Sequence, residues 1–151
     1  MKKFYKDGLR FSCKRCSRCC GTSPGFVYLS KRDLQYLCDF FKLSVKEFVE
    51  HYCRWADYYG GKTVLALFEQ ENYNCILWNN GCTAYKARPV QCSTYPFWTW
   101  MIEDEKTWNE CAKDCPGINN GNLHSAAEIL ERSFAYTANV PITKEEVLEL
   151  Y

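Results

Sequence analysis

The sequence has no long hydrophobic run. Nowhere do 18 consecutive apolar residues occur, so we expect no membrane-spanning helix. The amino-terminal stretch MKKFYKDGLRF is basic and lacks the apolar segment of a secretory signal peptide. We therefore expect a cytoplasmic protein without a membrane partner, in a reducing compartment where disulfides are rare.

Histidine is also scarce, and so is any excess of charge. The only histidines are His51 and His124, and the net charge is +1. No Ser/His/Asp arrangement and no convincing carboxylate pair stands out, and we interpret Glu103–Glu105 as a solvated turn. Catalytic residues stay unknown from the sequence, which favours a protein that is not an enzyme by itself. We also expect both histidines to serve as helix or cap residues rather than as metal ligands.

Cysteine, in contrast, is abundant. The chain has 11 cysteines, and their odd number argues against a closed disulfide framework. Four of them fall within eight positions of the stretch FSCKRCSRCCG, in which the two-residue gap of zinc knuckles and ferredoxin-type runs occurs twice. The basic residues between them would favour the thiolate form that binds metal. This CxxCxxCC stretch predicts metal ligands at Cys13, Cys16, Cys19 and Cys20.

The other cysteines divide into two classes. Cys75 and Cys82 flank the turn signal Asn80-Gly81, Cys92 follows Arg88-Pro89, and Cys111 and Cys115 lie close together before Pro116. We expect the amino-terminal cysteines to meet the Cys75–Cys92 segment, because four local thiols need distant partners to complete more than one site. Cys38 and Cys53 stand among apolar helix positions, so we expect them to be ordinary core residues.

The hydrophobic and capping patterns predict an α+β fold. Ser30 with Asp33, Ser44 with Glu47, Ser125 with Glu128 and Thr143 with Glu146 are typical helix starts. Residues 25–30 and 62–70 are typical of strands, residues 98–108 are expected to be extended and then to turn, and residues 115–121 are typical of a loop. The prediction is one small helix-rich domain over 1–151. Its irregular middle would be pinned by cysteines and stapled by metal, with a short hairpin, a metal-binding region at 11–121 and carboxy-terminal helices at 125–151.

These residues also resemble a known family. The stretches CKRCSRCC, CTAYKARPVQCSTYPF and CPGINNG, with Cys75 before the second, are similar to the YkgJ-type cysteine-cluster family, described as a zinc- or iron-chelating CxxCxxCC domain. The resemblance implies metal chelation by Cys13, Cys16, Cys19, Cys20, Cys75, Cys82, Cys92 and Cys115. Cys111 is a less regular member of this set. Larger flagellin lysine-N-methylases resemble this family too, but the Gly-rich signature of a methyl-donor site is missing here.

Three functions remain open at this point. The first is a metal-binding protein that holds zinc ions or an iron–sulfur cluster through two groups of cysteines, with Arg88 offsetting the charge of the thiolates. The second is an iron–sulfur redox or radical component that assists a protein-modification enzyme. The third is a basic adaptor, because residues 1–32 hold nine Lys/Arg against one acid. Nucleic-acid binding ranks last, since the aromatic platform of common RNA-binding modules is absent.

Overall fold

The computed structural model describes residues 3–14, 26–72, 74–79 and 81–151. They form helices and two small antiparallel sheets, so the prediction of an α+β fold is confirmed. The chain gathers into two compact units. The first unit comprises Met1–Cys19 and Thr94–Ala138, and the second comprises Cys20–Ser93 and Asn139–Tyr151. The single domain over 1–151 stays a prediction.

The second unit begins with two capped helices. Helix α1 (Lys31–Phe41) starts at Ser30, whose side chain accepts from the Asp33 backbone N–H while Asp33 accepts from that of Ser30. Helix α2 (Val45–Tyr52) starts at Ser44 with Glu47 in the same reciprocal arrangement. Both predicted capping boxes are therefore confirmed, and they fix the first turn of each helix.

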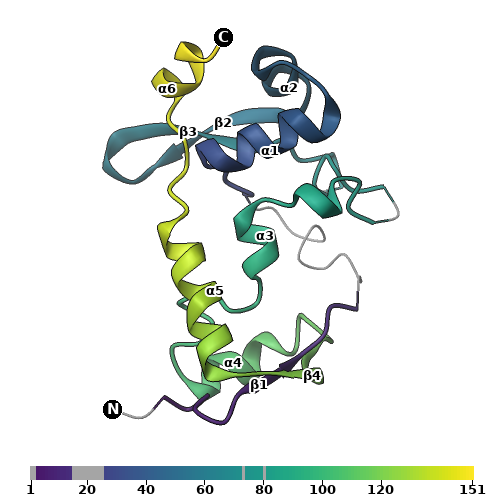
Figure 1. Ribbon diagram of the computed structural model, residues 1–151, viewed down its shortest axis with the longest axis vertical. Coiled ribbons are helices and arrows are strands. Elements are labelled where there is room, and N and C mark those ends of the chain that lie inside the picture. Colours follow the sequence, from purple (N-terminus) through teal and green to yellow (C-terminus); the bar gives the residue numbers. More distant parts are fainter. Residues whose placement is uncertain (1–2, 15–25, 73, 80) are drawn as a thin grey trace. The chain divides into compact units, whose positions relative to one another are not determined.

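A hairpin follows the two helices. Strand β2 (Cys53–Tyr58) pairs in antiparallel register with β3 (Lys62–Leu67) across a 3₁₀ turn at Tyr59–Gly61. The outer edge of β3 is covered by two short segments, because Leu65 donates to the Ile142 carbonyl and accepts from the Leu29 backbone. Figure 1 shows α1 lying across this hairpin, and the two elements share a core. That core includes Leu29, Leu34, Leu37, Phe48, Leu65 and Val147.

The remainder of the second unit is less regular. Between residues 68 and 93 lie a 3₁₀ turn at Tyr85–Ala87 and the start of the short helix α3 (Val90–Thr94). The carboxy-terminal helix α6 (Lys144–Glu149) starts at Thr143 with Glu146 in a third capping box, as predicted. Its residue Val147 is fully buried, so α6 closes one side of the core.

The first unit is built on the other sheet. Strand β1 (Leu9–Phe11) pairs in antiparallel register with β4 (Ile118–His124), and α4 (Glu105–Cys111) and α5 (Ala126–Ala138) accompany them (Figure 1). Phe97 and Trp108 stack with ring centroids 5.8 Å apart at the centre of its core. Helix α5 begins after Ser125, whose hydroxyl accepts from the Glu128 backbone, as predicted.

Three local predictions are wrong. Residues 118–121 are not a loop but part of β4, because Ile118 pairs with Phe11 of β1 and the Gly121 carbonyl accepts from the Arg10 guanidinium, contacts that an Asn- and Gly-rich composition does not suggest. Residues 98–108 are not extended. They form turns and then α4, which Asp104 caps by accepting from the Thr107 backbone.

Cys53 does not lie within a helix. It ends α2 and begins β2, because it pairs with Leu67 as the first position of the hairpin. In the part of the chain that the structure describes, no helix combines the length and apolar composition needed to cross a membrane.

Candidate metal centre

In the first unit, the chain that enters the CxxCxxCC stretch lies beside the Cys115 turn. The Ser12 backbone N–H donates to the Gly117 carbonyl at 3.3 Å, directly after the pairing of Phe11 with Ile118. A Cβ atom at Gly117 would collide with the Ser12 carbonyl oxygen, so this approach requires glycine. The residue before Cys13 is thus fixed against a residue two positions after Cys115.

Cys111 and Cys115 lie on one turn at the end of α4. The Cys115 backbone donates to the Cys111 carbonyl at 3.1 Å, and Cys115 is buried while Cys111 is half-buried. Burial raises the pKa of the Cys111 thiol, and the nearby charges of Asp114 and Glu110 raise it further. A metal ion would have to displace this proton, as metal binding to thiols does in general.

In the second unit, Cys75 and Cys82 stand at two ends of a tightly hydrogen-bonded segment. The Gln70 side-chain amide donates to the carbonyls of Cys75 (2.9 Å) and Trp78 (3.2 Å). Trp78 pairs with Cys82 as an isolated bridge, and Cys75 pairs in the same way with Glu69. The Asn79 backbone N–H donates to the Gly81 carbonyl, while Asn80 of the turn predicted at Asn80-Gly81 lies outside the described residues.

Cys92 lies in α3, and its neighbour Gln91 holds the chain that leaves the CxxCxxCC stretch. The Gln91 side chain accepts from the Tyr28 backbone N–H at 3.0 Å and donates to the Phe26 carbonyl at 2.8 Å. This pair of bonds resembles one rung of a sheet ladder. It fixes α3 against a segment that begins six residues after Cys20 in the sequence.

Arg88 lies between Cys82 and Cys92, as the sequence requires, and its side chain has a defined neighbour. The guanidinium carbon lies 4.0 Å from the centre of the Tyr85 ring. This cation–π contact anchors a positive charge in the segment between the two cysteines. The role of Arg88 in offsetting thiolate charge stays a prediction.

Cys38 and Cys53 pack against the hydrophobic core of the second unit, as expected for core residues. Burial and, to a smaller extent, Asp39 raise the pKa of Cys38 to about 11. Burial raises the pKa of Cys53 still more, with smaller contributions from the thiols of Cys38 and Cys75. Both thiols are therefore protonated at neutral pH in the described arrangement.

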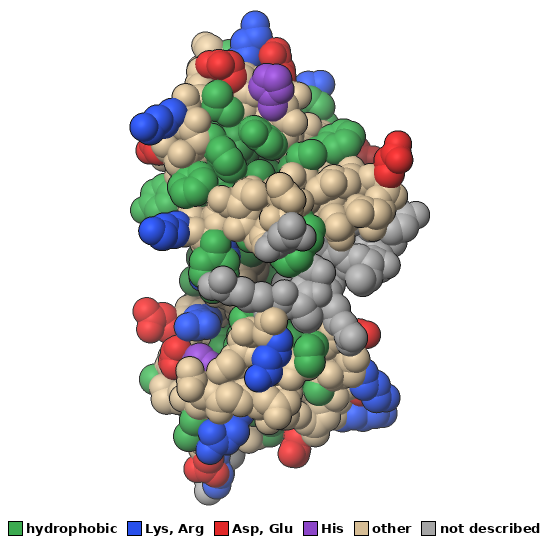
Figure 2. All heavy atoms as spheres, turned by 90° about the vertical axis from the view of Figure 1, so that its right-hand side faces the viewer, with side chains coloured by type: hydrophobic (Ala, Val, Ile, Leu, Met, Phe, Trp, Pro, Cys, Tyr) green, Lys and Arg blue, Asp and Glu red, His purple; other side chains and the backbone are tan. Residues whose placement is uncertain are grey.

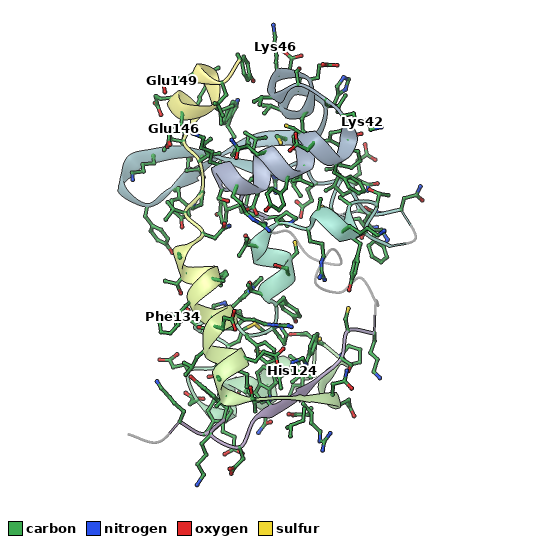
Figure 3. The ribbon with its side chains drawn as sticks, viewed as in Figure 1. Lys42, Lys46, His124, Phe134, Glu146 and Glu149 are labelled. Carbon is green, nitrogen blue, oxygen red and sulfur yellow. The ribbon has the colours of Figure 1, made fainter. Side chains whose placement is uncertain are left out.

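His124 has both ring nitrogens in hydrogen bonds. Figure 3 shows where His124 lies in the first unit. Its Nδ1 lies 2.9 Å from Glu128 Oε1, and its Nε2 lies 2.8 Å from the Phe11 carbonyl oxygen. Since both partners are acceptors, the two bonds form together when the imidazole is protonated. His124 joins β4 to α5 and to β1, which is a structural role.

The comparison with protein families decides the assignment of the chain. Residues 12–116, well over half of the sequence, match the family model described as CxxCxxCC, "Putative zinc- or iron-chelating domain". The chain belongs to the CxxCxxCC family. The comparison with solved structures found no match.

The CxxCxxCC match includes all nine candidate ligands, but the described residues do not assemble them into a complete site. Cys16, Cys19 and Cys20 lie outside the described residues, and Cys13 is exposed. Among the residues that are described, no three His, Cys, Asp or Glu side chains form a group able to hold a metal ion. The meeting of the amino-terminal cysteines with the Cys75–Cys92 segment therefore stays a prediction.

The chemistry of the donor set fits the metals named for the family. Every candidate ligand is a thiol, and thiolates are soft ligands that select zinc and iron–sulfur clusters over magnesium or calcium.

The basic-adaptor function would need a surface rich in Lys and Arg side chains. On the face shown in Figure 2, Lys and Arg side chains are interspersed with Asp and Glu and gather into no single patch of described residues.

Sequence reasoning missed three residues that hold the cysteine-bearing segments in place. Gln70 and Gln91 fix their segments through backbone contacts, which have no sequence signature of their own. Asp33 was recognised as a capping residue, but it also accepts from the Val90 backbone N–H at 2.9 Å. That second contact joins residues 57 positions apart, which no local pattern reveals.

Proposed function

We propose that this CxxCxxCC domain binds zinc or an iron–sulfur cluster through thiolates of the amino-terminal stretch together with thiolates from the remote segments. The remote ligands in this proposal are Cys75, Cys82, Cys92 and Cys115, with Cys111 as a further candidate. The metal would be structural in the first place. It would connect segments that the chain itself holds with few regular hydrogen bonds.

One observation carries the proposal: each end of the CxxCxxCC stretch is fastened next to a remote candidate ligand. In the first unit, Ser12 is bonded to Gly117, two residues after Cys115. In the second unit, Phe26 and Tyr28 are bonded to Gln91, the residue before Cys92. Such fastening on both sides is what a set of local and remote ligands requires.

The bound metal would supply neutralisation of several clustered thiolates, and iron would add redox chemistry. The protein's own residues set the conditions for this. The Gln70 amide holds the Cys75–Trp78 backbone. Arg88 contributes a positive charge to the segment of the sequence between Cys82 and Cys92. Around Cys115, the buried side chains of Phe11 and Ile118 exclude water.

The test is metal analysis of protein purified without oxygen. We expect zinc or iron bound to every folded chain, with a colourless solution for zinc and a brown one for an iron–sulfur cluster. Wild-type protein that folds and contains neither metal would refute the proposal.

Variants then separate ligands from core cysteines. We expect Cys92→Ser and Cys115→Ser to lose metal, because each leaves a coordination position open. Cys38→Ala and Cys53→Ala are the matched controls, and each should keep full metal content at a cost on the order of 1 kcal/mol of stability. Equal metal loss in Cys38→Ala and Cys92→Ser would show that this division of the cysteines is wrong.

A further inference from the structure

Asp33 has more contacts than its role as a helix cap requires. The side chain is fully buried. Its Oδ2 accepts from the Ser30 backbone N–H at 3.0 Å and from the Asn139 side-chain amide at 2.9 Å. Its Oδ1 accepts from the Val90 backbone N–H at 2.9 Å and from the Arg32 guanidinium at 3.1 Å. One carboxylate thus joins the start of α1, the start of α3 and the segment before α6.

The second capping box of the same unit shows what a purely local cap looks like. Glu47 accepts from the Ser44 backbone N–H at 3.3 Å, and Ser44 accepts from the Glu47 backbone at 3.1 Å. Glu47 is exposed, and its two capping bonds stay within α2 and its cap. Capping therefore explains neither the burial of Asp33 nor its bond to Val90.

The bond from Val90 fixes the short helix that carries Cys92. Val90 is the first residue of α3, and the Cys92 backbone donates to the Pro89 carbonyl in the same turn at 2.9 Å. Gln91 holds this turn at a second point, through the Phe26 and Tyr28 backbone. A helix of five residues has few bonds of its own, so these two ties help to fix where Cys92 lies.

We propose that Asp33 and Gln91 are positioning residues for the metal centre, which together set the place of Cys92 relative to α1 and to the segment that follows the CxxCxxCC stretch. This inference rests on the proposed function, because it assigns Cys92 as a ligand. Partners that orient ligands typically change metal affinity by about 10- to 100-fold when they are replaced.

The experiment measures how fast the metal of the purified holoprotein passes to a chromogenic chelator, at a temperature where circular dichroism shows every variant folded. We expect Asp33→Asn to release metal about 10- to 100-fold faster than wild type. An asparagine can accept from Val90 only by turning its amide nitrogen, a donor, towards the donors Ser30 and Asn139. Gln91→Ala should also release metal faster, and Ser93→Ala, on the same helix, should not.

A double variant separates positioning from capping. In Asp33→Asn with Asn139→Asp, the new carboxylate can accept from the new amide, which leaves the amide oxygen facing Val90. The Ser30 backbone still lacks its acceptor. We expect the slow release of wild type to return while the thermal stability stays lowered. A double variant that releases metal as fast as Asp33→Asn would overturn the assignment to Asp33.

Glu47→Gln is the matched control, since it makes the same chemical change in the local capping box. It and Ser30→Ala should lower stability without faster release. Equal acceleration in these controls, or release at the wild-type rate in both Asp33→Asn and Gln91→Ala, would overturn the proposal. If Asp33→Asn does not fold, Gln91→Ala against Ser93→Ala decides. Wild-type protein without metal would instead refute the proposed function itself, and this inference with it.

Discussion

Two neighbouring regions of the second unit are held together in different ways. Residues 31–67 form two capped helices and a hairpin with six paired positions, and they provide most of the buried apolar side chains of the second unit. Residues 68–93, as far as they are described, contain two isolated bridges, one 3₁₀ turn and the start of α3. Their buried apolar residues are Leu77, Ala84, Ala87 and Pro89.

The difference lies in what stabilises each region. The first has local hydrogen bonds and a packed core, so its sequence is enough to specify it. The second depends on single side chains: Gln70 bonds within it, and Asp33 and Gln91 join it to α1 and to the segment before α1. It also carries Cys75, Cys82 and Cys92. A region with little core of its own and three thiols is one that a metal would stabilise.

Metal removal should affect the two regions differently, and it gives the largest expected effect. We expect chelation to unfold residues 68–93 first and to lower the thermal midpoint of the whole protein, because site formation and folding share free energy. Hydrogen exchange followed by mass spectrometry should show lost protection in peptides from 68–93 and retained protection in peptides from 31–67.

The control is the same protein with metal restored without oxygen, which should recover protection in residues 68–93. Unchanged exchange and an unchanged thermal midpoint after complete metal removal would contradict the idea that metal staples this region.

The regular region was largely predictable from sequence, and for a physical reason. Ser30 with Asp33 and Ser44 with Glu47 encode their helix starts within four residues, and residues 62–67 combine β-branched and apolar residues in a short run. Strand β4 was not predictable, because Asn119 and Gly121 adopt positive φ and the strand exists only through its pairing with β1. Pairing over more than 100 residues leaves no local pattern.

The candidate site divides in the same way. The spacing of the CxxCxxCC stretch predicted metal ligands, the family resemblance extended the predicted set to the remote cysteines, and the match over residues 12–116 confirmed the family. The residues that hold the cysteine-bearing segments in place could not be predicted from the sequence. Gln91 acts through the backbone of Phe26 and Tyr28, and Asp33 acts through that of Val90, so in each case the partner's side chain does not matter.

Loss of one side-chain contact should give an effect of intermediate size and should differ between the two regions. Gln70→Ala removes two hydrogen bonds, to the Cys75 and Trp78 carbonyls, so we expect a loss of about 1–2 kcal/mol in the free energy of unfolding. Gln35→Ala, an exposed position on α1, is the control in the regular region and should change stability by less than about 0.5 kcal/mol. Urea denaturation of the holoprotein measures both. Similar values for the two variants would mean that residues 68–93 do not depend on such ties.

The smallest effect concerns the buried thiol of the regular region. Burial raises the pKa of Cys38 from 9.0 to about 11, so the unfolded chain loses this proton at a lower pH than the folded protein. Below pH 9 both states hold the proton, and the contribution of Cys38 to stability is complete. Between pH 9 and about 11 the thiol ionises in the unfolded chain while it stays protonated in the folded protein. This difference lowers the free energy of unfolding by at most about 1.4 kcal/mol per pH unit.

Cys38→Ala isolates that contribution from other groups that titrate at high pH. We expect the variant to be less stable than wild type at pH 8. The difference in the free energy of unfolding should shrink as the pH rises to 10, because only wild type has a Cys38 thiol whose ionisation favours the unfolded chain. Urea midpoints of both proteins at pH 8, 9 and 10, without oxygen, give the comparison. A difference that stays constant over this range would mean that the Cys38 thiol ionises alike in both states, and its burial would then count only as packing.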